Sequence, residues 1–417
     1  MIKDTPFAMD RDSEISDVSM SEDSSDDEVM EPGDSHIDNE DDSEDEEEDN
    51  AEDEAKGEED EEEDELVKAI TASKELHREH PPDITVDDYI LNVCFHPEQD
   101  LIALANVNGD IFVHKYNNTE TSLQSVIEVH EKACRDIQFN DNGDTLYSVS
   151  KDKSIMITDF NTQKLKGIYE NAHDCPINVI SLITENTFAT GDDDGTIKLW
   201  DSRHSERTPI FSVKKMNDYV SSMLTNDEKK YLVCSSGDGS ILTINLPAKK
   251  VQCQSFEYDE EFTCMGLFKN STKILAASGT GKFYIFNWGE FGLHSDEFPN
   301  VNKKSINCMV PITDNIVITG NEDGLLRAFS VFPHARLGIA GQHDYSVETL
   351  DISRDGSLIA SSSHDNKVKF WNIKYFETYD LMQQAQGNKN KKSKQAKFNL
   401  PSSKIDNSSD FFADLNK

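Results

Sequence analysis

The stretch Thr187 to Asp201 reads T-F-A-T-G-D-D-D-G-T-I-K-L-W-D, and it predicts the fold of the chain. Phe188 to Thr190 favours a β-strand, Gly191 to Gly195 is rich in turn-forming residues, and Thr196 to Trp200 resumes as a strand with alternating side chains. The segment is therefore predicted to be a β-hairpin that ends in Trp-Asp. The same phrase returns at Ser361 to Asn372 as S-S-S-H-D-N-K-V-K-F-W-N, which indicates an internal repeat.

The repeat has a regular period along most of the chain. Seven positions align with Trp200 at a spacing of roughly 42 to 44 residues: His114, Thr158, Trp200, Ile244, Phe286, Phe329 and Trp371. Six residues before each lies a turn position, which is Asp in five repeats: Asn108, Asp152, Asp194, Asp238, Thr280, Asp323 and Asp365. Asp suits a turn because its short carboxylate accepts hydrogen bonds from nearby backbone N–H groups.

This period and the Trp-Asp ending resemble the WD-repeat family. The resemblance implies an all-β fold, a seven-bladed WD-repeat β-propeller. It also implies that a His, a Ser or Thr, the turn Asp and the Trp of a blade form a buried hydrogen-bonded set. Two repeats contain the full set: His173, Thr190, Asp194 and Trp200 in the third, and His343, Ser361, Asp365 and Trp371 in the seventh. The second repeat keeps His130 and Asp152 but has Thr158 in place of Trp.

The composition divides the chain into a propeller and two tails. Residues 1–65 contain 33 Asp or Glu and three Lys or Arg, so they carry most of the formal net charge of −41. Such a segment cannot bury a core, and we expect an acidic disordered tail. Residues 66–81 are predicted to be a short helix or linker, 82–376 the propeller, and 377–417 a polar, Lys-rich, disordered tail. Ile84 to Val86 is expected to close the ring as the outer strand of the last blade.

Both tails carry candidate interaction motifs. The acidic tail is either a solubilising segment or a site for basic partners such as histones, ribosomal proteins and their assembly factors. Phe411 and Phe412 are candidate docking side chains, on the propeller or on a partner. A basic cluster predicts a nuclear or nucleolar signal or a weak RNA contact, against the alternative of a plain solvated tail: Lys389, Lys391, Lys392, Lys394 and Lys397.

Catalytic, metal and membrane functions find little support in the sequence. The seven cysteines include no C-x-x-C pair, which predicts reduced intracellular thiols. Asp192 to Gly195 lacks the alternate carboxylates of a calcium loop, and Gly279 to Lys282 lacks the flanking residues of a P-loop. No apolar run approaches the roughly 18 residues of a membrane span. His–Asp–Ser/Thr sets that recur in several repeats indicate structure rather than a hydrolase triad. We predict a monomeric binding platform that is not an enzyme and has no cofactor.

One short motif suggests a specific partner. Trp200 to Arg203 matches W-D-x-R, the box through which some WD-repeat proteins dock onto the adaptor of cullin-type ubiquitin ligases. The motif resembles that box, and Arg203 is the residue it assigns to docking. An Arg two residues after Trp-Asp also arises by chance.

Several segments resemble the WD repeat-containing protein 55 family, in an invertebrate version. They include K-A-C-R at 132–135, F-N-W-G-E-F-G at 286–292, C-M-V-P at 308–311 and D-F-F at 410–412. The resemblance implies a protein of the nucleus and nucleolus, with a cytoplasmic fraction, that supports ribosomal RNA production and ribosome assembly. Its expected partners are ribosome-assembly factors or other basic nuclear proteins, with RNA contacted mainly through proteins. Two alternatives stay open: a ubiquitin-ligase substrate receptor, and histone or chromatin binding through the acidic tail.

Overall fold

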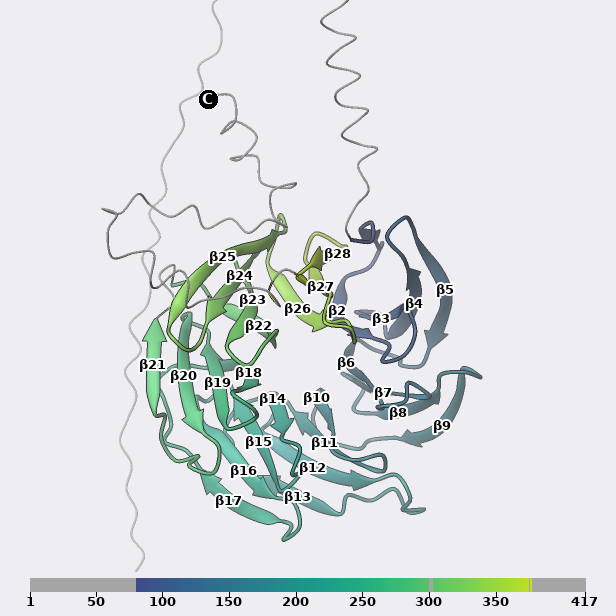
Figure 1. Cartoon of the computed structure of the whole chain (residues 1–417). Coiled ribbons are helices and arrows are strands. Elements are labelled where there is room, and N and C mark those ends of the chain that lie inside the picture. Colours follow the sequence, from purple (N-terminus) through teal and green to yellow (C-terminus); the bar gives the residue numbers. More distant parts are fainter. Residues whose placement is uncertain (1–79, 300–302, 375, 377–417) are drawn as a thin grey trace, which may run out of the picture. The chain divides into compact units, whose positions relative to one another are not determined.

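The computed structural model describes residues 80–299, 303–374 and 376, which form a ring of β-sheets (Figure 1). Seven antiparallel sheets of four strands each surround a central axis. In six blades the strands follow one another from the axis outward. The predicted seven-bladed β-propeller is confirmed. The predicted helix or linker at 66–79 and both tails lie outside the described residues.

The strands are short and regular, and each blade begins with its innermost strand. Blades 1 and 2 contain β2 (Ile90–Phe95), β3 (Leu101–Asn106), β4 (Asp110–Tyr116) and β5 (Thr121–Glu128), then β6 (Cys134–Phe139), β7 (Thr145–Ser150), β8 (Ile155–Asp159) and β9 (Lys164–Tyr169). Blades 3 and 4 contain β10 (Ile177–Leu182), β11 (Thr187–Asp192), β12 (Thr196–Asp201) and β13 (Phe211–Lys214), then β14 (Val220–Thr225), β15 (Tyr231–Ser236), β16 (Ile241–Asn245) and β17 (Lys250–Gln254). Blades 5 and 6 contain β18 (Phe262–Phe268), β19 (Lys273–Ser278), β20 (Lys282–Asn287) and β21 (Asp296–Pro299), then β22 (Ile306–Pro311), β23 (Ile316–Asn321), β24 (Leu325–Ser330) and β25 (Ala335–Gln342).

Blade 7 is built from both ends of the propeller. It contains β26 (Val347–Ile352), β27 (Leu358–Ser363) and β28 (Lys367–Asn372), and its outer strand is β1 (Ile84–Thr85). Ile84 pairs with Val368 and Thr85 with Lys367 in antiparallel register. The predicted closure by the segment that begins at Ile84 is therefore confirmed, and β1 pairs with the first two residues of β28.

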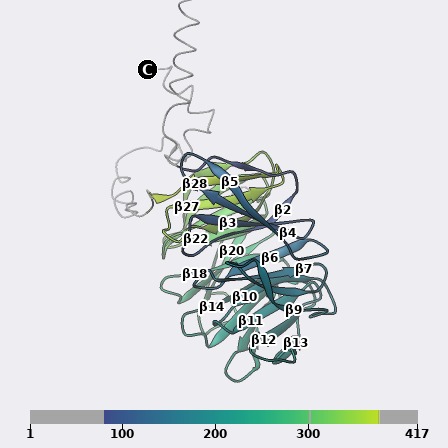
Figure 2. The ribbon, with the colours of Figure 1, turned by 90° about the vertical axis from the view of Figure 1, so that its right-hand side faces the viewer.

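The core lies between neighbouring blades, because each sheet presents buried side chains on both faces. Trp200 of β12 stacks on Phe188 of β11 at 6.3 Å between ring centroids, and Tyr169 of blade 2 meets Trp200 edge-on at 5.4 Å. Aromatic side chains of this size bury large apolar areas and dominate the energetics of a core. Turned by 90° (Figure 2), the ring shows its strands running from one face to the other.

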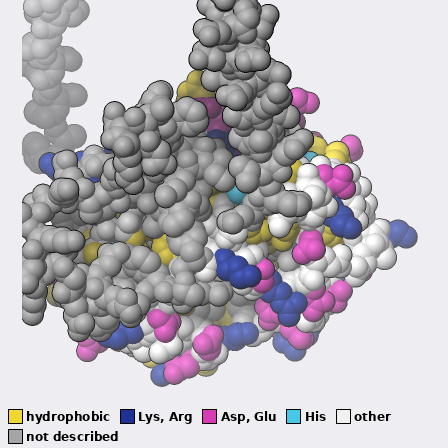
Figure 3. All heavy atoms as spheres, turned by 45° about the horizontal axis from the view of Figure 1, so that its top comes forward, with side chains coloured by type: hydrophobic (Ala, Val, Ile, Leu, Met, Phe, Trp, Pro, Cys, Tyr) yellow, Lys and Arg dark blue, Asp and Glu magenta, His cyan; other side chains and the backbone are white. Residues whose placement is uncertain are grey.

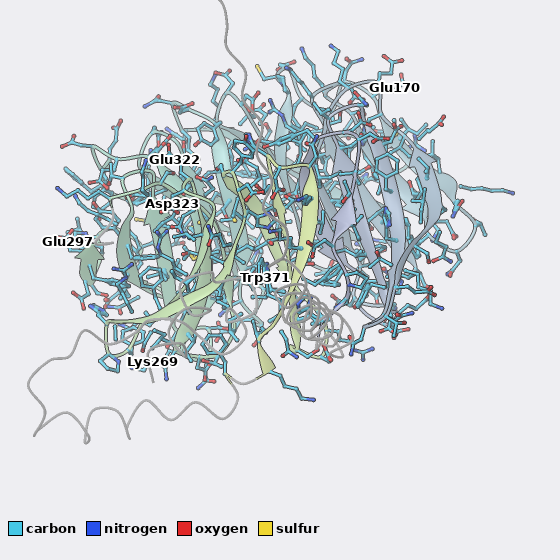
Figure 4. All side chains as sticks on the ribbon, turned by 90° about the horizontal axis from the view of Figure 1, so that it is seen from above. Glu170, Lys269, Glu297, Glu322, Asp323 and Trp371 are labelled. Carbon is cyan, nitrogen blue, oxygen red and sulfur yellow. The ribbon has the colours of Figure 1, made fainter. Side chains whose placement is uncertain are left out.

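The two faces of the ring carry different connections. We call one face the upper face: it carries the turns between the second and third strands of each blade and the loops that lead from one blade to the next. The lower face bears the other turns. Figure 4 views the ring edge-on, with Glu170, Glu322 and Asp323 toward the upper face and Lys269 toward the lower one.

Candidate protein-binding surface

A relay of hydrogen bonds joins four buried side chains of blade 3. The Trp200 Nε1–H donates to Thr190 Oγ1 over 2.8 Å, and this hydroxyl lies 2.7 Å from His173 Nε2. Because the Thr190 oxygen accepts from Trp200, its own proton is available for His173. His173 Nδ1 lies 2.9 Å from Asp192 Oδ2 and donates to that carboxylate.

The ionisation of the blade 3 relay follows from its burial. Burial lowers the pKa of His173 in spite of the carboxylate beside it, so the imidazole is neutral at pH 7. Burial raises the pKa of Asp192, but hydrogen bonds from His173 and from the Thr196 N–H outweigh it and leave that pKa below its ordinary value. The relay therefore holds a neutral imidazole against an ionised carboxylate.

The acid of this relay is Asp192, and the predicted role of Asp194 is wrong. The Asp194 side chain is exposed and forms an ion pair with Lys214. Asp192 is the last residue of β11, a position that Ser363 occupies in β27 of blade 7. The Asp192 Oδ1 accepts the backbone N–H of Asp194 over 3.0 Å. The Asp192 carboxylate of blade 3 therefore has two roles that blade 7 divides between two residues: Ser363 caps the turn, and Asp365 binds the histidine.

Blade 7 contains the predicted relay. The Trp371 Nε1–H donates to Ser361 Oγ over 2.8 Å, and this hydroxyl lies 2.7 Å from His343 Nε2. His343 Nδ1 lies 2.8 Å from Asp365 Oδ2. His343, Ser361 and Trp371 are buried and Asp365 is partly buried, and because they bond to one another they stabilise the blade.

Two degenerate blades replace the relay in different ways. In blade 2, His130 Nε2 lies 2.8 Å from Ser148 Oγ and its Nδ1 lies 3.1 Å from Asp152 Oδ2. In blade 6, the guanidinium of Arg327 is buried and binds both oxygens of Asp323. Arg327 was not predicted from the sequence, although it is an Arg inside the apolar strand L-L-R-A-F-S, four residues after the turn Asp.

One cavity of the surface is the upper mouth of the central channel. It has a volume of about 530 Å³ and is lined by the first residues of the seven innermost strands. These residues are mostly polar and come from equivalent positions: Leu91, Arg135, Asn178, Ser221, Thr263, Asn307 and Glu348.

Charged and aromatic groups stand at this mouth. The Tyr219 hydroxyl donates to Glu261 Oε2 over 3.4 Å, and Glu348 Oε1 lies 2.6 Å from His364 Nε2. Burial and then the Glu261 carboxylate raise the pKa of Tyr219 to about 12, so its hydroxyl stays protonated. Arg135 is the one basic side chain among the lining residues, and it pairs with Asp193. The mouth is therefore rich in hydrogen-bond acceptors with negative charge.

Deeper in the channel, two carboxylates bridge neighbouring blades. Asp136 Oδ2 accepts the Ile180 N–H over 2.8 Å, while its Oδ1 accepts from Asn92 Nδ2 over 3.0 Å. Asp351 Oδ2 accepts the Phe95 N–H over 2.6 Å. Burial raises the pKa of Asp136 to about 7 and that of Asp351 to about 6. The two acids link blades 1, 2, 3 and 7 and belong to the wall of the channel.

The loops around the mouth are acidic as well. Among the described residues, the connections of the upper face contain 18 Asp or Glu and six Lys or Arg, whereas those of the lower face contain 12 and seven. The described surface visible in Figure 3 shows both signs of charge side by side. The larger excess of negative charge among these loops therefore lies on the upper face, and it favours a partner with positive charge.

The remaining candidate residues lie away from this mouth. Arg203 lies on a lower-face loop of blade 3 with its side chain 68% exposed, and its Nε and Nη2 donate to Asp201 over 2.9 and 2.6 Å. The docking candidates Phe411 and Phe412 and the basic signal lie outside the described residues: Lys389, Lys391, Lys392, Lys394 and Lys397.

The described residues contain no other site of recognisable chemistry. Within them, no three His, Cys, Asp or Glu side chains are placed to hold a metal ion, and no helix is long and apolar enough to cross a membrane. The seven cysteines are free thiols, and burial raises the pKa of five of them: Cys94, Cys134, Cys234, Cys264 and Cys308. A raised pKa disfavours the reactive thiolate.

Comparison with known proteins identifies the family. A family model described as WDR55 matches residues 81–376, which is most of the chain. The chain belongs to the WDR55 family. It is 48% identical over 350 residues to a WD repeat-containing protein 55 homolog of Aedes aegypti, covering 84% of this chain and 74% of that relative. A homolog of the same name from Drosophila persimilis is 47% identical over 351 residues, covering 84% of this chain and 69% of that relative.

Membership of the WDR55 family indicates the general role of this propeller. A WD-repeat propeller of this family is a protein-interaction scaffold. The relays hold the blades of this WDR55 propeller, and the faces and the channel mouth are the surfaces that it offers to partners. The acidic upper face is the candidate binding surface.

Proposed function

We propose that this protein is a nucleolar scaffold that supports ribosomal RNA production and ribosome assembly by holding a basic protein segment on its upper face. It acts by binding and carries out no chemical step. The observation that carries the proposal is the threefold excess of acidic over basic residues in the upper-face loops, which surround the channel mouth. Family membership supports the scaffold role.

The mouth suits a cationic side chain. An arginine or lysine that enters it meets the carboxylates of Glu261 and Glu348 and the ring of Tyr219. Carboxylates bind guanidinium groups through charge-assisted hydrogen bonds, and an aromatic face adds a cation–π attraction of about 0.5–2 kcal/mol. The acidic loops around the mouth would speed the encounter with a basic partner, and salt would slow it.

Affinity purification of the full chain from nuclear extract tests this proposal. The upper-mouth variant Glu261→Gln/Glu348→Gln is compared with a lower-face control, Asp141→Asn/Glu185→Gln, which neutralises two carboxylates at a smaller pocket. We expect wild type and control to retain assembly factors and ribosomal precursor RNA, and the upper variant to lose about tenfold or more, because desolvated charge pairs contribute 1.4 kcal/mol or more.

Two controls make the outcome decisive. The variants are checked for unchanged thermal melting and for location in the nucleolus. Equal recovery of the same partners by all three proteins would contradict binding through the upper mouth. Recovery of histones in place of assembly factors would replace the ribosomal assignment with chromatin binding.

A second candidate function rests on Arg203. Its exposed guanidinium is held in one orientation by two hydrogen bonds to Asp201, as a docking residue at a blade edge would be. If the protein is a substrate receptor, the cullin adaptor co-purifies with wild type and is lost with Arg203→Ala. If the adaptor is absent from both purifications, W-D-x-R is a chance feature of the repeat.

A further inference from the structure

Two large apolar side chains are exposed together where blade 4 meets blade 5. Phe256 follows β17, the outer strand of blade 4, and Leu293 lies in the loop that leads to β21, the outer strand of blade 5 (Figure 1). Each residue is 65% exposed, the highest value among the large apolar residues that the structure describes. Both line one shallow hollow of about 630 Å³. We call these two side chains the rim patch.

Hydrogen bonds fix the backbone around the rim patch. The Phe256 N–H donates to the Gly292 carbonyl over 2.9 Å, which ties the segment of blade 4 to the loop of blade 5. The Tyr258 hydroxyl accepts the His294 N–H over 3.2 Å and lies 2.7 Å from His294 Nδ1, so a second link stands beside the first. A partner would therefore meet a preformed surface, which lowers the entropic cost of binding.

Buried aromatic side chains anchor the loop that carries Leu293. Phe291 is 4% exposed and meets Tyr231 of blade 4 edge-on, with 5.6 Å between the ring centroids. It also meets Trp288 edge-on at 5.5 Å. Phe291 thus occupies the buried side of the loop and leaves Leu293 on the solvent side.

The segments that form the rim patch are acidic. Residues 254–261 and 287–299 together contain seven Asp or Glu and no Lys or Arg. Glu290 lines the hollow itself, and Glu257 is exposed. Neither carboxylate forms an ion pair with another described residue, and Lys273 is linked to Glu290 only through the amide of an asparagine side chain. The rim patch therefore combines exposed apolar surface with negative charge.

We propose that the rim patch binds a short segment of a partner protein in which an apolar side chain is flanked by Arg or Lys. The apolar side chain packs against Phe256 and Leu293, and the basic side chains pair with Glu257 and Glu290. Apolar surface that a rigid loop holds in water is typical of a protein-interaction site, and arginine is enriched at such interfaces.

The charge of the rim patch disfavours segments of the protein itself. Phe411 and Phe412 of the C-terminal tail are flanked by Asp410 and Asp414. A second copy of the chain brings a formal net charge of −41. Both meet electrostatic repulsion at the rim patch, whereas a basic segment is attracted. The inference does not depend on the proposed function, because the hollow shares no residue with the channel mouth.

Selection from a random library of short peptides tests the proposal on the full chain. The rim-patch variant is Phe256→Ser/Leu293→Ser. Its matched control is Leu123→Ser/Val126→Ser on β5, where the two residues are 53% and 40% exposed. The library is first depleted on the rim-patch variant, which removes peptides that bind elsewhere on the chain, and is then selected on wild type. We expect the enriched peptides to carry an apolar residue between basic ones.

The affinities of the enriched peptides are then measured by fluorescence anisotropy, after equal thermal melting of the three proteins is established. We expect equal binding to wild type and to the β5 control, and binding that is weaker by about tenfold or more for the rim-patch variant. Equal affinity for all three proteins would overturn the proposal. So would a library from which no peptide is enriched on wild type after depletion.

A second variant separates charge from apolar contact and serves if the serine variant does not fold. Glu257→Gln/Glu290→Gln keeps both apolar side chains. We expect it to bind the selected peptides about fivefold more weakly than wild type at low salt, and the difference to vanish at high salt. Enrichment of acidic peptides would contradict the assigned partner. Dimerisation of wild type that Phe256→Ser/Leu293→Ser abolishes, measured by analytical ultracentrifugation, would assign the rim patch to a second copy instead.

Discussion

Blades 7 and 4 have the same four-stranded architecture but are held together differently. In blade 7, Ser361 connects Trp371 to His343 by hydrogen bonds. In blade 4 the equivalent positions are Cys234 and Ile244, both fully buried among apolar side chains. Apolar packing alone is thus sufficient to build a blade, and the relay adds directional bonds whose members depend on one another.

Ser361→Ala is expected to have the largest effect on stability. It leaves the Trp371 Nε1–H and a His343 nitrogen buried without their partner, which costs roughly 3 kcal/mol in the free energy of unfolding. The matched control is Ser362→Ala, since the Ser362 hydroxyl is buried and has no hydrogen-bond partner among the described residues. Urea unfolding of both variants measures the difference. Equal losses of stability in the two variants would show that the hydrogen bonds of Ser361 contribute nothing beyond the volume of its hydroxyl group.

Asp192→Ala should cost roughly 2 kcal/mol, because it removes the partner of a buried His173 and the acceptor that caps the turn. Asp194→Ala should cost less than about 0.5 kcal/mol, since an exposed ion pair with Lys214 contributes little. The midpoints of chemical unfolding at pH 7 compare them. A larger loss for Asp194→Ala would restore the assignment made from the sequence.

The buried carboxylate of Asp136, which bridges blades 1, 2 and 3, predicts that the stability of the propeller depends on pH. The folded pKa of Asp136, about 7, lies above its ordinary value of 3.8, so the folded state binds the proton more tightly. Stability from this group is therefore fully present below about pH 4 and is lost as the pH rises to about 7. Asp136→Asn places an amide that does not titrate at this position. The free energy of unfolding of wild type should fall between pH 5 and pH 7.5, and that fall should be smaller by roughly 1–2 kcal/mol in the variant. An unchanged difference would assign the pH dependence to other groups.

The smallest effect concerns a hydroxyl of blade 4. Thr243 Oγ1 is buried and has no hydrogen-bond partner among the described residues. Thr243→Val should therefore raise stability by about 0.5 kcal/mol, whereas Thr190→Val in the blade 3 relay should lower it. Thermal melting of the two variants compares the same substitution in the two settings. A loss for Thr243→Val would indicate an ordered water at that hydroxyl.

The sequence predicted the fold because the repeat period and the turn residues are local signals. The spacing of Trp200 and Trp371 positioned the blades, and Ile84 was recognised as the closing strand. The acid of blade 3 was misassigned because three consecutive Asp residues share one turn, and only the backbone geometry shows that the last residue of β11 points toward His173. Arg327 was missed because a charged residue in a strand is ordinarily expected to face solvent. The channel mouth is lined by residues that lie about 40 positions apart in the sequence, and the sequence alone does not show that they meet in space.

The pairing of β1 with β28 also sets the order in which the molecule can be completed. The ribosome synthesises Ile84 roughly 280 residues before its partner Val368. The outer position of blade 7 can therefore be filled only after nearly the whole propeller has left the exit tunnel, although earlier blades can form as the chain emerges. Ring closure is consequently among the last folding events of the propeller, and a partner that requires the closed ring can bind only after the last blade has formed.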